Sequence, residues 1–170
     1  MAAASRPRVR IVLPSGALRP SDLPAFEDGI ARLNAAGFEV RFDPRRAEAR
    51  WRDYYAGTDA ERVAEFIAAL REPDVDIVWW GRGGAGCARL VPQLLQAAQH
   101  LPPRILIGFS DATAVLNAFA AQLGWLTFHG PAITSLARAD LDRLRAVVCG
   151  EVRTTPILTD ICTDQDAALE

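Results

Sequence analysis

A serine stands on a short glycine-containing turn in the middle of the chain. Ser110 lies in GFSD at 108–111, directly after the apolar run 104–107 and at the start of a segment of helical period, 111–123. Hydrolases place a nucleophilic serine on this kind of strand-turn-helix connection, where its hydroxyl is accessible. The backbone N–H of Asp111 and the positive end of the following helix would then face the developing oxyanion. The alternative is that Ser110 only caps the helix.

A second turn, GRGGAG at 81–86, is rich in glycine and also follows an apolar run. Its glycines allow positive φ angles and a close approach of the backbone to a ligand. Gly83 or Gly84 is therefore a candidate for a second oxyanion donor, and Arg82 for a ligand of a substrate carboxylate. Two alternatives stay open: a tight structural turn, and a phosphate-binding nest. The nest fits poorly, because no acidic residue that would bind a ribose stands at the expected distance after the turn.

Four other side chains near these turns are candidates for a role in the site, and two of them have more than one interpretation. Cys87 follows the glycine-rich turn and is either a thiolate nucleophile or, as we favour, a small residue facing the core. His129 ends an apolar run in FHGP and is either a general base for Ser110 or, as we favour, a group on the substrate side or one that shapes the loop. Tyr54 and Tyr55 are candidates for lining a site.

Short β-rich runs alternate with helical periods, which predicts a parallel sheet with crossover helices. We expect strands at 9–13, 38–42, 75–80, 104–107 and 125–129, and helices at 23–35, 59–71, 87–99, 111–123 and 140–148. The fold class is thus a three-layer α/β fold of flavodoxin-like or class I glutamine amidotransferase-like type, with Trp79 and Trp80 filling the two faces of a central strand. Ligands gather at the carboxyl ends of such strands. PSG at 14–16, the glycine-rich turn and the serine turn are all expected there.

Composition narrows the classes of partner and site. The 170 residues include 19 basic and 21 acidic ones, for a net charge of −2, and no run of like charge suited to nucleic acid or to a membrane surface. The three cysteines lack metal-ligand spacing, so neither a disulfide framework nor a metal site is expected, and no cofactor is implied. The N-terminus has no signal-peptide pattern, which predicts a cytoplasmic protein.

Taken together, several blocks resemble one known family. PSG at 14–16, YAGTDAERVAEFIAAL at 55–70, PDVDIVWWGRGGAGCARLVPQL at 73–94, ILIGFSDATAVLNAF at 105–119 and TFHGP at 127–131 are similar, in order and spacing, to the amino-terminal domain of the LD-carboxypeptidases, serine peptidase family S66. Members hydrolyse amide bonds between an L- and a D-amino acid, typically releasing the terminal D-alanine of murein tetrapeptides. A related branch cleaves the antibiotic microcin C7.

The resemblance implies roles for particular residues. Ser110 matches the nucleophile, and the N–H groups of Asp111 and Gly84 match the oxyanion hole. The family's triad also needs a His and a Glu from a carboxyl-terminal domain, and neither His100 nor His129 matches that histidine. We therefore expect residues 1–150 to form the nucleophile domain, and 151–170 to be a linker toward a domain that the chain does not contain. Such a chain would turn over little by itself.

One departure and two alternatives complete these expectations. Ala85 stands where the family usually has an aromatic residue, so the murein tetrapeptide is a less secure assignment than the peptidase chemistry. The chain could instead be a noncatalytic domain that binds a partner protein, with a homodimer as one form. It could also be an amidotransferase-like hydrolase that uses Cys87.

Overall fold

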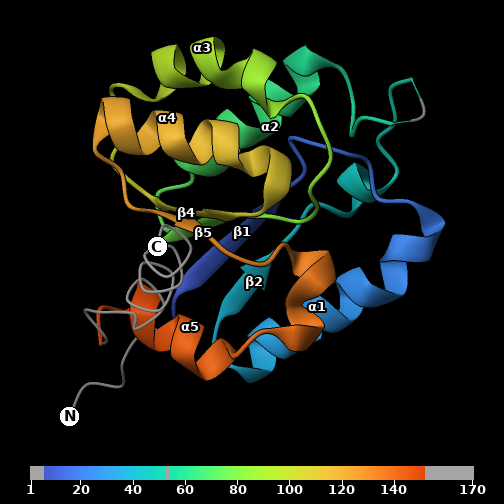
Figure 1. Ribbon diagram of the computed structural model, residues 1–170, viewed down its shortest axis with the longest axis vertical. Coiled ribbons are helices and arrows are strands. Elements are labelled where there is room, and N and C mark those ends of the chain that lie inside the picture. Colours follow the sequence, from blue (N-terminus) through green and yellow to red (C-terminus); the bar gives the residue numbers. More distant parts are fainter. Residues whose placement is uncertain (1–5, 53, 152–170) are drawn as a thin grey trace, which may run out of the picture. The chain divides into compact units, whose positions relative to one another are not determined.

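A computed structural model describes residues 6–52 and 54–151. Its sheet has five parallel strands in the order β2-β1-β3-β4-β5 (Figure 1). The strands are β1 Arg8–Val12, β2 Glu39–Arg41, β3 Ile77–Trp80, β4 Ile105–Gly108 and β5 Thr127–His129. All five predicted strands are present, and the predicted α/β class with a parallel sheet is confirmed. The observed strands differ from the expected ranges by at most two residues at their ends, because pairing with a neighbour decides where a strand stops.

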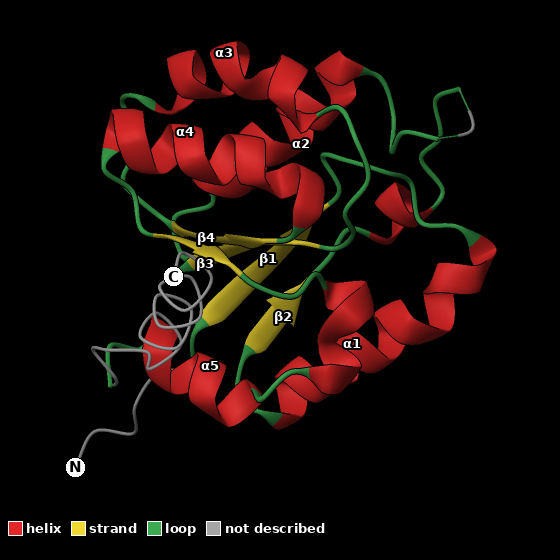
Figure 2. Ribbon diagram, viewed as in Figure 1, coloured by secondary structure: helices red, strands yellow, loops and turns green. Residues whose placement is uncertain are grey.

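Helices cover both faces of this sheet, as Figure 2 shows for α2, α3 and α4 on one face and α1 on the other. The helices of this unit are α1 Leu23–Ala35, α2 Asp59–Arg71, α3 Cys87–Ala98 and α4 Thr113–Leu123. The capping box predicted for α2 is present: Glu61 N donates to Thr58 Oγ1 at 3.3 Å, and Thr58 N donates to Glu61 Oε2 at 2.7 Å. The three-layer prediction is therefore confirmed.

Two tryptophans on the central strand fill the core on both sides of the sheet. Trp79 and Trp80 are both 0% exposed. Trp79 packs edge-on against Phe38 with ring centroids 6.2 Å apart, whereas Trp80 packs against Phe66 of α2 at 5.1 Å. These partners lie on opposite faces, as the alternation of side chains along a strand requires. The strand that leads into the glycine-rich turn is therefore buried by rings on both faces.

Contacts within the chain divide it into a unit Met1–Ala139 and a unit Asp140–Glu170. Within the second unit, α5 spans Leu141–Val148, and its N-cap Asp140 accepts a hydrogen bond from Arg143 N at 2.9 Å. The predicted linker, 151–170, lies outside the described residues except for its first residue, and the domain boundary after residue 150 stays a prediction. Among the described residues, no helix has the length and apolar character to cross a membrane.

Candidate active site

The serine turn holds its central residue in an unusual backbone conformation. After β4, Phe109 is extended, with φ −132° and ψ 152°, and Ser110 then takes φ +60°. Within 6–52 and 54–151, only Arg52 and Ser110 combine a side chain with positive φ. The hydroxyl-bearing residue is exposed at the surface. An exposed serine in this conformation between a strand and a helix has the geometry of a nucleophile elbow.

The capping interpretation of Ser110 is wrong. An N-cap residue has extended backbone angles and accepts a hydrogen bond with its side chain, whereas Ser110 is left-handed. The chain first makes a 3₁₀ turn over Ser110–Ala112, and α4 starts at Thr113, with no side-chain hydrogen bond capping either element in the described structure. The helix predicted from residue 111 thus begins two residues later.

Glycine usually makes a protein less stable than alanine at the same position, but the left-handed backbone of Ser110 predicts the opposite order. We expect Ser110→Gly to unfold with a free energy about 1 kcal/mol higher than Ser110→Ala, because the left-handed region penalises a Cβ by about 1–2 kcal/mol. Urea unfolding of the 170-residue chain measures the difference. The control is Ala121→Gly on the exposed surface of α4, which should lose about 1 kcal/mol because glycine is a poor helix former. A glycine variant less stable than the alanine variant at position 110 would remove the case for a strained turn.

The glycine-rich turn lies against the serine turn. A Cβ added to Gly83 would be 3.3 Å from Ser110 Cβ and 3.7 Å from its Oγ. Gly84 has φ +148°, and a Cβ there would be 2.5 Å from Gly16 N, so the PSG turn lies on its other side. Gly16 N also donates to Gly83 O at 3.3 Å. The structure therefore brings together the three turns that the sequence placed at the carboxyl ends of strands.

The two predicted oxyanion donors have free amides. Neither Gly84 N nor Asp111 N donates a hydrogen bond to any residue of the described structure. Both residues are only partly buried, so a ligand atom can reach them from solvent. Two unpaired donors on adjoining turns, beside an exposed serine, form the arrangement that an oxyanion hole requires. Their role stays a prediction, as does that of the serine.

Cys87 does not have the character of a nucleophile. Its side chain is 0% exposed, and its Sγ lies 3.0 Å from Ser15 Oγ. Burial, with the nearby Asp111 carboxylate as a second cause, raises the pKa of the Cys87 thiol to about 12. The thiol is therefore protonated at neutral pH and inaccessible to a substrate. The interpretation as a core residue fits, and the alternative of a hydrolase using Cys87 is wrong.

Arg82 belongs to the glycine-rich turn, and His129 lies beside the serine turn. Arg82 Nε is 3.1 Å from Asp22 Oδ2, and its Nη1 donates to Ala17 O at 2.9 Å. Both contacts hold the segment after β1, so a substrate carboxylate would have to share a guanidinium that is already engaged. His129 is exposed at the end of β5, opposite Gly108 in register, with its ring centroid 5.2 Å from that of Phe109. It thus borders the serine turn. Substrate binding by Gly83, Arg82 and His129 stays a prediction.

A buried arginine that the sequence did not reveal supports the turns from behind. Arg62 of α2 is 0% exposed, donates through Nη1 to Pro14 O at 2.5 Å, and holds its guanidinium 4.9 Å from the centroid of the Tyr55 ring. A Cβ on Gly86 would be 3.0 Å from its Nη1. One side chain thus contacts the PSG turn, the loop of Tyr55 and the glycine-rich turn. Arg62 lies four residues before Phe66 and eight before Leu70, so its helical spacing with the apolar face of α2 is the sequence signal that could have found it.

Tyr54 and Tyr55 have different environments: Tyr55 packs against arginine side chains, and Tyr54 is exposed. Tyr55 is enclosed by cations, since the guanidinium of Arg89 also lies 5.2 Å from its ring centroid. Tyr54 is 47% exposed, and its carbonyl accepts a hydrogen bond from Ala17 N at 2.8 Å. Of the two predicted lining residues, Tyr54 therefore has the accessible ring.

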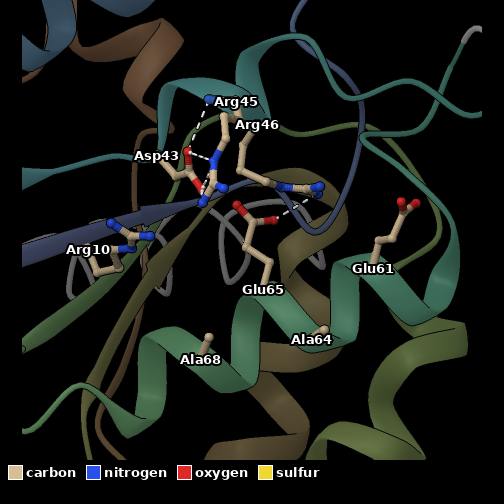
Figure 3. A pocket seen from close by; sticks show the side chains of 8 residues that line it. All are labelled: Arg10, Asp43, Arg45, Arg46, Glu61, Ala64, Glu65 and Ala68. Atoms are coloured by element: carbon tan, nitrogen blue, oxygen red, sulfur yellow. Dashed lines mark hydrogen bonds and ion pairs between the residues drawn. The ribbon is translucent and has the colours of Figure 1, made fainter.

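A cavity of about 410 Å³ lies between α2, the 44–47 turn and β1 (Figure 3), lined by Arg10, Asp43, Arg45, Arg46, Glu61, Ala64, Glu65 and Ala68. Glu65 is its best-buried acid, with the side chain 8% exposed, 3.1 Å from Arg46 Nη2. Burial raises the pKa of Glu65, against the opposing effect of Arg46. The same carboxylate accepts a hydrogen bond from Leu13 N at 3.3 Å, at the entry to the PSG turn. No predicted site residue lines this cavity, and Glu65 serves the site by anchoring that turn.

Comparison with known proteins identifies the family. The model of the LD-carboxypeptidase N-terminal domain, peptidase family S66, matches residues 9–130. The chain belongs to the LD-carboxypeptidase family. This S66 domain is 38% identical over 142 residues to the murein tetrapeptide carboxypeptidase of Pseudomonas aeruginosa, covering 81% of this chain and 43% of the relative. It is 39% identical over 108 residues to the microcin C7 self-immunity protein MccF of Escherichia coli, covering 64% of this chain and 31% of that protein.

Solved structures agree with this assignment. The structure of MccF in complex with glutamyl sulfamoyl guanosine superposes with a TM-score of 0.74 at 25% identity, over 90% of this chain and 46% of that one. The S66 chain thus spans less than half the length of these relatives. The resemblance to the family and the predicted α/β fold are both confirmed.

Proposed function

We propose that this S66 chain supplies the nucleophile and the oxyanion hole of a serine LD-carboxypeptidase acting on murein-derived peptides in the cytoplasm. The observation that carries the proposal is the exposed, left-handed Ser110 beside two unpaired amides. The name of the Pseudomonas relative supports the substrate class. The general base and its orienting carboxylate are proposed to come from a carboxyl-terminal domain of the family type.

The chemistry follows from this arrangement. Ser110 Oγ attacks the carbonyl carbon of the L-residue while a histidine takes its proton, and the carbonyl oxygen becomes an oxyanion that accepts hydrogen bonds from Gly84 N and Asp111 N. Collapse breaks the C–N bond, and the histidine returns the proton to the amine of the departing D-alanine. Water, deprotonated by the same histidine, then hydrolyses the acyl ester and regenerates the serine. Without that base the hydroxyl is a weak nucleophile at neutral pH.

The test supplies the missing base. Residues 1–170 are assayed alone and fused to the carboxyl-terminal domain of the Pseudomonas relative, with a murein tetrapeptide ending in D-alanine and with its epimer ending in L-alanine. We expect the fusion to release D-alanine from the first peptide only, and the chain alone to release almost none. Labelling by a fluorophosphonate, located by mass spectrometry, reports whether Ser110 is activated.

Two results would contradict the proposal in different ways. A folded fusion in which Ser110 resists the fluorophosphonate would argue against its role as nucleophile. A fusion that the fluorophosphonate labels at Ser110, but that releases no D-alanine when assayed without the label, would argue against the substrate class. The complex of MccF with glutamyl sulfamoyl guanosine makes an aminoacyl conjugate of a nucleoside the second substrate to assay with the unlabelled fusion.

A further inference from the structure

The carboxylate of Asp111 connects the serine turn to the helix that follows the glycine-rich turn. Its Oδ2 accepts a hydrogen bond from Cys87 N at 3.0 Å, across 24 residues of sequence. Cys87 is the first residue of α3, whose N-terminal amides have no partner within the helix. The contact therefore joins the residue after the nucleophile to the residue after the glycine-rich turn.

Helix α3 needs this outside partner, because it has no cap of its own. The residue at its N-cap position is Gly86, which has no side chain and a left-handed φ of +101°, and the first turn of α3 contains no acidic residue. A helix N-terminus carries a partial positive charge of about half a unit, which a carboxylate offsets. Asp111 supplies both the acceptor and the negative charge that the sequence of α3 lacks.

Cys87 also contacts the PSG turn, the third turn of the candidate site. Cys87 Sγ lies 3.0 Å from Ser15 Oγ and 3.6 Å from Pro14 O, both in the PSG turn. Cys87 thus contacts the serine turn through its amide and the PSG turn through its sulfur. The buried thiol that the proposed mechanism leaves unused has a place here as a contact point.

We propose that the Asp111 side chain is a positioning residue, which fixes the separation between the two oxyanion donors by binding Cys87 N. The inference rests on the proposed function. Asp111 would then act twice: its amide donates to the oxyanion, and its carboxylate holds the turn that carries Gly84. Because the charge of the carboxylate is offset by α3, it does not oppose the negative charge that develops in the hole.

Two variants separate the hydrogen bond from the charge. Asp111→Asn keeps an acceptor oxygen for Cys87 N and removes the charge, whereas Asp111→Ala removes both, and each keeps its own backbone amide. In the fused enzyme we expect the alanine variant to lose roughly 30- to 100-fold in kcat with KM within about twofold, since an ångström of misplacement costs about a hundredfold. The asparagine variant should stay within about fivefold of the wild type.

The matched control removes a cap elsewhere. Thr58→Ala removes the N-cap side chain of α2 and should destabilise that helix in the way that Asp111→Ala destabilises α3. Thr58 contacts neither turn of the oxyanion hole. We expect this variant to keep its kcat. An equal loss of kcat in Thr58→Ala and Asp111→Ala would overturn the proposal in favour of general destabilisation.

A measurement on the 170-residue chain keeps the proposal testable if the fusion shows no activity. Amide hydrogen exchange at Cys87 should quicken about five- to tenfold in Asp111→Ala and remain near the wild type in Asp111→Asn, and the amide NMR signal of Gly84 should shift only in the alanine variant. Unchanged exchange and signals in Asp111→Ala would overturn the proposal. An inactive wild-type fusion with these exchange effects intact would contradict the proposed function while supporting the Asp111 contact.

Discussion

Replacing Ser110 with alanine should abolish release of D-alanine by the fused enzyme, lowering kcat by about 10⁴-fold or more. The Oγ atom that forms the acyl ester is gone, and only binding and the oxyanion hole remain to help water attack directly. KM should change little, because Ser110 contributes few contacts to the bound peptide. Steady-state kinetics with the D-alanine tetrapeptide give both constants.

The stability of the variant is the control for its loss of activity. Urea unfolding of Ser110→Ala should match the wild type within about 0.5 kcal/mol, since an exposed side chain without partners adds little stability. Full activity in a folded Ser110→Ala enzyme would mean that another residue is the nucleophile. Ser110→Cys is a useful companion, because a thiol can retain partial turnover and accept thiol-specific labels.

Replacing Gly84 with alanine should have the next largest effect. Its φ of +148° is strained for any side chain, and the added Cβ would lie 2.5 Å from Gly16 N and 2.8 Å from Gly16 Cα. Both are backbone atoms, so no rotamer relieves the overlap and the glycine-rich turn must move. We expect kcat to fall at least about a hundredfold, as for the loss of an oxyanion donor, and stability to fall by about 2 kcal/mol.

Gly124→Ala separates the effect of backbone strain from the effect of the overlap with Gly16. Gly124 ends α4 with φ +67°, also left-handed, but nothing lies within 4 Å of an added Cβ. It should lose about 1 kcal/mol from backbone strain alone and keep its kcat. Urea unfolding and kinetics of both variants give the comparison. If Gly84→Ala behaved like Gly124→Ala, the contact between the PSG and glycine-rich turns would have no part in the site.

Local signals predicted the helices more closely than the strands. The ranges expected for α1 and α2 match the structure to the residue, because the Thr58 capping box and the glycine after α1 mark helix ends within the sequence itself. The two-sided burial of Trp79 and Trp80 was also predictable from their position in an apolar run. Strand ends depend on partners that lie far away in the sequence, and these carry no local mark.

The candidate site was predictable in its members but not in its connections. Ser110 and Gly84 stand in recognisable turns, yet a serine does not reveal its own φ, and that angle was needed to exclude the cap. The contacts of Arg62 with Pro14 and of Asp111 with Cys87 span 48 and 24 residues. Single-sequence patterns report spacing along one element, so contacts of this kind stay invisible until the turns are brought together.

The strand order also locates the point where many folds of this class hold a ligand. The chain runs from β1 outward to β2 and then returns to β3 on the other side of β1, so the topological switch point lies between β1 and β3. Flavodoxin-like proteins open a crevice at that point and hold a cofactor in it. Here Gly16 and Gly84 meet across it, backbone against backbone, with Gly16 N bonded to Gly83 O. The chain itself fills this point, and the proposed nucleophile stands one strand further along, after β4, with Gly84 reaching it from the turn after β3.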